Sequence, residues 1–166
     1  METDFKEIRE PREKLDPQAL KAWFLKGLIV GIFLLILPAV YFVHTASAWD
    51  LPILYGWFGL AAVILYILWA SVIEPQLKMR YWRYEIRKEE IDIQRGIFIR
   101  KRTLIPMIRV QHVDTEHGPI MRLFGLATLI ISTAATNHRI PALSQRKAKE
   151  LRGEISDLAK VSDEDV

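Results

Sequence analysis

The side chains that could carry out chemistry in this chain are few and far apart. The histidines are His44, His112, His117 and His138, and there is no cysteine. His112 and His117 stand five residues apart, and an odd separation places two residues on opposite faces of a regular strand. A zinc site needs three or four ligands, and no further ligand stands at a suitable spacing. We therefore expect no metal site.

Ser132, Thr133 and His138 invite comparison with a nucleophile and its general base. No G-x-S-x-G elbow surrounds the serine, and no acidic residue stands in a convincing third role. The sequence also lacks a glycine-rich phosphate-binding loop. We expect a protein that is not an enzyme and that uses no cofactor.

Basic residues form the more informative pattern. Arg87 and Lys88 occupy a predicted turn, and Arg100, Lys101 and Arg102 are consecutive in a predicted strand. One interpretation is contact with anionic lipid head groups, worth about 1 kcal/mol for each well-placed base, or with a partner protein. The alternative is that these charges guard an exposed strand edge against aggregation, which is a common protective device.

Two long apolar segments must position these residues, at about residues 22–43 and 51–73. A helix needs about 20 apolar residues to cross the hydrocarbon core, and backbone inside lipid must satisfy its own hydrogen bonds. The sequence therefore predicts a transmembrane helical hairpin over residues 17–74. Asp16 as a cap and Pro17 in the first turn mark its start. Pro38 predicts a tolerated kink within the first span.

Lysine and arginine flank both spans, whereas the loop of residues 44–50 contains neither. The positive-inside rule then places both termini, including the segment 1–16, in the cytoplasm. The spans contain no acidic residue, which argues against a transporter or proton relay. Small residues that would let helices pack closely are Gly27 and Gly31 in the first span and Gly56, Gly59 and Ala62 in the second.

After Glu74 the hydrophobic period changes from that of a helix to that of a strand. Alternating or strand-like segments are predicted at residues 81–86, 91–94, 97–99, 103–105, 110–115, 126–133 and 138–141. An amphipathic helix is predicted from Ser144 to about Ala159, and residues 161–166 form an acidic tail. A meander followed by one helix is typical of a pleckstrin-homology (PH)-like barrel or sandwich, here over residues 79–160. The fold class is α+β.

Several short motifs carry a resemblance to a known family. They are Tyr81-Trp82-Arg83-Tyr84, Gly96, the run from Ile105 to Val113, Gly118-Pro119, the run from Arg122 to Leu129, and Leu15-Asp16-Pro17-Gln18-Ala19-Leu20 with Trp23. In order and spacing they resemble the YdbS-like bacterial membrane proteins with a PH-like domain, over nearly the whole chain. The resemblance implies a multi-pass protein of the bacterial cytoplasmic membrane without catalytic residues. It also implies a partner, a larger membrane protein with several PH-like domains.

We therefore expect a non-enzymatic PH-like binding module that is anchored in the lipid bilayer and acts as a subunit of an envelope membrane complex. Anionic lipid head groups are a further partner if the bases touch the membrane. A nucleic-acid partner is not expected, because the net charge is only +3. Two alternatives stay open. One is an immunity or resistance protein against membrane-active antimicrobial peptides, and the other is an accessory subunit of a channel or transporter.

Overall fold

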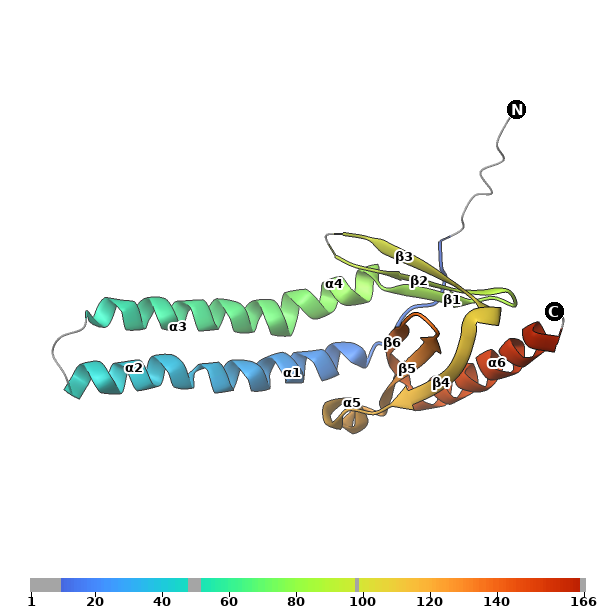
Figure 1. The fold of residues 1–166 in the computed structure, drawn as a ribbon. Helices are drawn as coiled ribbons and strands as arrows, with labels where there is room; N and C mark the ends of the chain where they lie inside the picture. Colours follow the sequence, from blue (N-terminus) through green and yellow to red (C-terminus); the bar gives the residue numbers. More distant parts are fainter. Residues whose placement is uncertain (1–9, 48–51, 98, 165–166) are drawn as a thin grey trace, which may run out of the picture.

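A computed structural model describes residues 10–47, 52–97 and 99–164. It shows a long helical hairpin with a β-rich domain at one end (Figure 1). The first arm contains α1 (Ala19–Leu34) and α2 (Ile36–Ser47). The second contains α3 (Ile53–Leu68), the π-helical turn η1 (Trp69–Ile73) and α4 (Glu74–Tyr81). The domain comprises β1 (Arg83–Ile86), β2 (Glu90–Arg95), β3 (Lys101–Pro106), the 3₁₀ turn η2 (Met107–Arg109), β4 (Val110–Glu116), α5 (Pro119–Leu123), β5 (Leu126–Thr133), β6 (Asn137–Ser144) and α6 (Gln145–Glu164).

Both arms have the length and apolar character that a membrane span requires, over Ala19–Ala46 and Ile53–Tyr81. Only 17% and 11% of their most apolar stretches are buried, whereas a core helix of a soluble protein would be mostly buried. Large apolar side chains such as Phe33, Leu37 and Leu65 are each 66% exposed on the outside of the hairpin. Such helices, apolar on their outer faces, match acyl chains rather than water.

Two prolines account for the two irregularities in the arms. Pro38 has no N–H to donate to the carbonyl of Leu34, and the first arm is interrupted at Leu35, one turn before the proline. Pro75 likewise cannot donate to the carbonyl of Ser71, and the π-helical turn η1 ends at Ile73, two residues before this proline. The predicted kink of the first arm therefore takes the form of a short break between α1 and α2.

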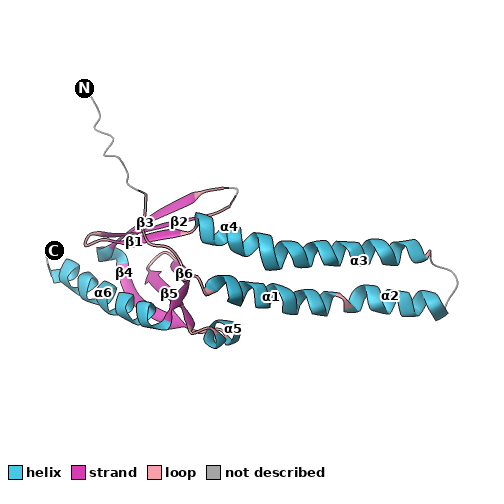
Figure 2. Cartoon of the chain, turned by 180° about the vertical axis from the view of Figure 1, so that it is seen from behind, coloured by secondary structure: helices cyan, strands magenta, loops and turns pink. Residues whose placement is uncertain are grey.

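The domain is built from two three-stranded antiparallel sheets, in the orders β1-β2-β3 and β4-β5-β6 (Figure 2). The prediction of a closed barrel, one of the two architectures expected from the sequence, is therefore wrong. The turn η2 separates β3 from β4, and β1 and β6 are not paired. Instead, the N-terminal segment crosses between these two edges. Glu13 pairs with Tyr84 of β1, and the N–H of Asp16 donates to the carbonyl of Ala142 in β6 at 3.1 Å.

The main core lies between the sheets and beneath α6. Ala148, Leu151 and Ile155 of α6 are buried, as the helical period predicted. The helix runs to Glu164, past its predicted end near Ala159, so it includes the first residues of the expected acidic tail. The strands contribute the other large buried side chains, namely Tyr84, Ile91, Met107, Leu129, Ile131 and Ile140.

The base of the hairpin shares this interior. Leu15 belongs to the main core and is only 3% exposed. Ala19 and Ala22 of α1 form a second buried cluster with Leu126 and Ala142 of the domain. Residues 79–160 therefore fold around Leu15, which precedes the first span, and around the first turns of α1, so the first arm is packed against the domain.

Candidate functional site

The basic residues singled out from the sequence lie at two opposite ends of one sheet. Arg87 and Lys88 are in the β1–β2 turn, far from the hairpin (Figure 1). Arg100 and Lys101 are where the β2–β3 loop enters β3, at the end from which the hairpin leaves. Arg102 follows in β3, opposite Gln94 of β2. Lys88 is therefore separated from Arg100 and Lys101 by the length of the sheet, whereas the side chains of Arg87 and Arg102 converge on Asp92 between these ends.

Two of these arginines serve the sheet itself, because they surround the fully buried carboxylate of Asp92. Arg102 donates from Nε to both oxygens of Asp92, at 3.0 and 3.1 Å, and from Nη2 at 2.5 Å. This hydrogen bonding raises the pKa of Arg102. Arg87 pairs with Glu85 at 2.8 Å and Glu90 at 3.2 Å, and lies 3.9 Å from Asp92. Both guanidinium groups thus stabilise the domain.

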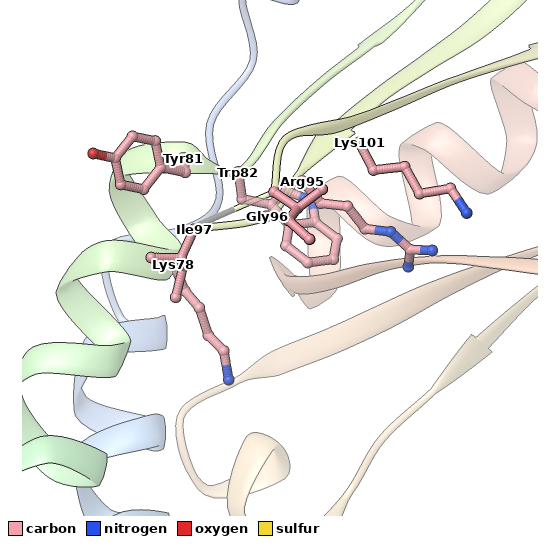
Figure 3. Close-up of a pocket in the computed structure, with 8 residues that line it drawn as sticks. Lys78, Tyr81, Trp82, Arg95, Gly96, Ile97 and Lys101 are labelled. Atoms are coloured by element: carbon pink, nitrogen blue, oxygen red, sulfur yellow. The ribbon is translucent and has the colours of Figure 1, made fainter.

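A cavity of about 500 Å³ lies between the end of α4 and the β2–β3 loop (Figure 3). We call it the membrane-end cavity, because α4 continues directly from the second span. Its lining residues are Lys78, Tyr81, Trp82, Arg95, Gly96, Ile97, Ile99 and Lys101. The charged groups of Arg95 and Lys101 extend toward the same side, and Lys78 reaches out from α4 (Figure 3). Among the described residues, no acidic side chain lines it.

The loop that forms one wall of this cavity depends on Gly96. Its φ is +113°, a conformation that only glycine adopts without strain. A Cβ at this position would also collide with the carbonyl oxygen of Ile99. The chain therefore leaves the sheet after Arg95, and Ile97 and Ile99 stand in a loop, so the strand predicted over residues 97–99 is wrong. Ile99 is 85% exposed.

The membrane-end cavity is surrounded by an excess of positive charge. Within the described parts of the chain, Arg95, Arg100 and Lys101 have no ion-pair partner, whereas Lys78 pairs with Glu74 one turn away in α4. The guanidinium of Arg100 lies 5.5 Å from the ring centre of Tyr81, a cation–π distance. The buried indole N–H of Trp82 has no hydrogen-bond partner among the described residues. Spare cations and a spare donor beside apolar walls can bind an anion that carries an apolar part.

This positive charge also affects the pKa of His138 in β6. Its pKa is lowered, first by burial and then by the charges of Arg95 and Lys101. His112 lies elsewhere, on β4, with Nε2 3.8 Å from a carboxylate oxygen of Asp114. In the ranges that the structure describes, no three His, Asp or Glu side chains gather as metal ligands would.

The small residues of the hairpin fall into two groups. A Cβ at Gly27 would lie 2.8 Å from the backbone oxygen of Ala70, and one at Gly56 would lie 2.6 Å from Cε1 of Phe42. A Cβ at Gly31 would collide with the side chain of Ile67. These three glycines therefore bring the two arms together. By contrast, a Cβ at Gly59 would meet no described atom within 4 Å, and Ala62 is exposed, so this second small surface of α3 is open.

The site residues predicted from the sequence did not include Lys78, Tyr81, Trp82 or Arg95. Their positions in the sequence could have indicated a site. Tyr81 and Trp82 are the first aromatic residues after the second span, and residues 95–101 place isoleucines between basic residues. The strand-like alternation of that segment concealed its loop character.

The bacterial PH domain family matches residues 19–159, beginning at the first residue of α1. The chain is 43% identical over 158 residues to the UPF0699 transmembrane protein YdbS of Bacillus subtilis (strain 168), covering 95% of this chain and 98% of that relative. It is 28% identical over 149 residues to the UPF0699 transmembrane protein YdbT of the same bacterium, covering 87% of this chain but only 29% of that larger relative. No solved structure matches the chain. The chain belongs to the bacterial PH domain family and to the UPF0699 transmembrane proteins.

Proposed function

We propose that this protein is a non-enzymatic, membrane-anchored PH-like binding module that acts as a subunit of an envelope membrane complex. Its partner is a larger membrane protein that carries PH-like domains. The observation that carries this proposal is the pair of relatives in one bacterium, a small and a large transmembrane protein that both resemble this chain. Because the small and the large protein share ancestry, we expect their surfaces to match each other.

The way in which the domain joins the hairpin supports a module held in a fixed position. Only Trp82 separates α4 from β1, so no flexible linker follows the second span. Leu15 and Ala19 lock the base of the first arm into the domain interior. A domain fixed in this way keeps its binding surfaces at one height above the bilayer. Weak contacts to a second membrane protein then benefit from a high effective concentration.

The proposed orientation places the domain and both termini in the cytoplasm, because the flanks of the spans are basic and residues 44–50 are not. The natural chain has no cysteine, so single cysteines report without background. An impermeant thiol reagent applied to intact cells is expected to label Ser47→Cys but not Ser162→Cys. Labelling of the second variant alone would invert the orientation.

The open small surface of α3 is the proposed contact for a helix of the partner. The test is extraction of the tagged protein from its native membranes in mild detergent, followed by identification of the proteins that accompany it. We expect the larger UPF0699 relative in stoichiometric amount. Gly59→Leu is expected to reduce its recovery, because added atoms would keep the helices apart.

Ala61→Leu is the matched control for this experiment. Ala61 is exposed on the same helix but lies about 160° around it from Gly59 at 3.6 residues per turn. Equal loss of the partner in both variants would contradict a contact through the face of Gly59. Recovery of the protein without any larger relative would contradict the proposed function itself.

A further inference from the structure

We propose that the membrane-end cavity binds the head group of an anionic phospholipid in the leaflet that the domain faces. This inference names a ligand for the binding module and rests on the proposed membrane-anchored function, but not on the partner protein. It relies on three observations. They are the depth of the cavity relative to the bilayer, the exposed apolar side chains near it, and the charge of its walls.

The height of the cavity follows from the helix that forms one wall. The apolar run of the second span ends at Ile73, and α4 continues from it. With a rise of about 1.5 Å per residue, Lys78 lies about 7.5 Å beyond Ile73 along the helix. The head-group layer extends about 5–7 Å beyond each side of the hydrocarbon core. Lys78 therefore stands at about the depth of the lipid phosphates.

Two apolar tips flank the hairpin at the same end of the domain. Ile99 in the β2–β3 loop and Leu123 at the end of α5 are 85% and 76% exposed, the highest values among the large apolar side chains described. Both lie outside the apolar runs of the spans. Figures 1 and 2 show the β2–β3 loop and α5 on the side of the domain from which the hairpin leaves. Contact with acyl chains would remove both side chains from water.

The charge of the cavity selects an anionic lipid. Arg95 and Lys101 have no ion-pair partner among the described residues, unlike Arg87 and Arg102 at Asp92. Positive charge that no described ion pair neutralises is therefore present beside the cavity, at the membrane side of the sheet. Each well-placed base strengthens attraction to an anionic membrane about fivefold.

The shape and chemistry of the walls favour a lipid over a free phosphate ion. The ammonium group of Lys78 pairs with Glu74 in this structure and would exchange that partner for a phosphodiester. The indole N–H of Trp82 is buried in the cavity wall without a hydrogen-bond partner among the described residues. Tyr81 and Ile97 add apolar surface that suits the glycerol and the first carbons of the acyl chains. The volume of about 500 Å³ exceeds what a phosphate ion alone would fill.

The test uses the full chain, purified in mild detergent, freed of lipid and incubated with phosphatidylglycerol or phosphatidylcholine. Native mass spectrometry then counts the retained lipids. We expect one phosphatidylglycerol to be retained in preference to phosphatidylcholine. The double variant Arg95→Gln/Lys101→Gln is expected to weaken that retention about 25-fold, from about fivefold per base.

The control Lys88→Gln/Arg152→Gln removes the same charge from exposed positions elsewhere on the domain. It is expected to retain phosphatidylglycerol like the natural chain. Equal losses in the two double variants would show a response to net charge alone and would overturn the site. Full retention in the Arg95→Gln/Lys101→Gln variant would overturn it as well. An unchanged thermal unfolding midpoint in each variant excludes unfolding as the cause.

His138 provides a second readout and distinguishes a lipid from a soluble anion. A bound anion would offset the charges of Arg95 and Lys101, so phosphatidylglycerol is expected to raise the pKa of His138 in an NMR titration of the full chain. Phosphatidylcholine is expected to leave it unchanged. An equal rise with millimolar inorganic phosphate would make the cavity a site for a soluble anion and would overturn the lipid proposal.

The partner measurement separates this inference from the proposed function. Recovery of the larger relative is measured on the same Arg95→Gln/Lys101→Gln variant, in its native membranes. We expect the partner to be retained while the phosphatidylglycerol is lost, because the open surface of α3 is unaltered. Equal retention of both lipids by a chain that still recovers its partner would overturn the lipid site alone.

Discussion

Arg102→Gln is expected to destabilise the domain far more than a change at a neighbouring base. Asp92 has no exposed surface, and Arg102 makes its three shortest contacts, at 2.5–3.1 Å. Removing one partner of a buried ion pair costs about 3–5 kcal/mol. The side chain of Arg102 is 27% exposed, and Arg87 remains 3.9 Å from Asp92, so we expect the lower end, about 3 kcal/mol. A domain is stable by about 5–15 kcal/mol in total.

Urea unfolding of the full chain in detergent micelles, followed by tryptophan fluorescence, measures this loss. The control is Arg100→Gln, which removes an exposed cation near Tyr81 and should cost less than about 1 kcal/mol. Replacing both members of the buried pair, as Arg102→Met/Asp92→Leu, should restore much of the stability, because no buried charge is left unpaired. Equal small losses in Arg102→Gln and Arg100→Gln would refute the assigned role of Arg102.

Three further predictions concern the core, the hairpin and pH. Leu15→Ala should lower the free energy of unfolding by about 2–4 kcal/mol in the same urea assay, because Leu15 is buried in the domain core although it precedes the first span. Gly27→Leu should lower the thermal unfolding midpoint in detergent, because the added side chain meets the backbone of Ala70, whereas Gly59→Leu should not. Since the pKa of His138 is lowered in the folded state, the unfolded state takes up the proton first as pH falls below 6.5. Stability should therefore fall below pH 6.5, and His138→Gln should reduce that fall in unfolding curves recorded from pH 5 to 8.

Local patterns were sufficient for part of this fold. The length and apolarity of the two runs predicted the hairpin, and the 3.6-residue period predicted which face of α6 is buried, as Leu151 and Ile155 show. Pro38 and Pro75 act through the hydrogen bond that each cannot make, which is also a local property. In contrast, Ile97 and Ile99 alternate as a strand would, and a single glycine with positive φ, Gly96, removes them from the sheet.

Contacts between distant parts of the chain account for what the sequence did not predict. Arg100 and Arg102 look alike in sequence, yet only Arg102 meets a carboxylate, which lies on the neighbouring strand. Leu15 stands in a polar segment that looks like a leader to the first span, and its burial depends on strands that follow much later. Whether the first and last strands of a meander pair to close a barrel is likewise a non-local property.

We propose that the hairpin holds one end of the PH-like domain against the bilayer. Spin labels on single cysteines at Ile99, Leu123 and Lys88, in vesicles of phosphatidylglycerol and phosphatidylcholine, test it most directly through their collisions with oxygen and with a water-soluble nickel complex. We expect labels at Ile99 and Leu123 to collide with oxygen and to be shielded from nickel, and a label at Lys88 to be open to nickel. Equal access of nickel to all three labels would contradict it.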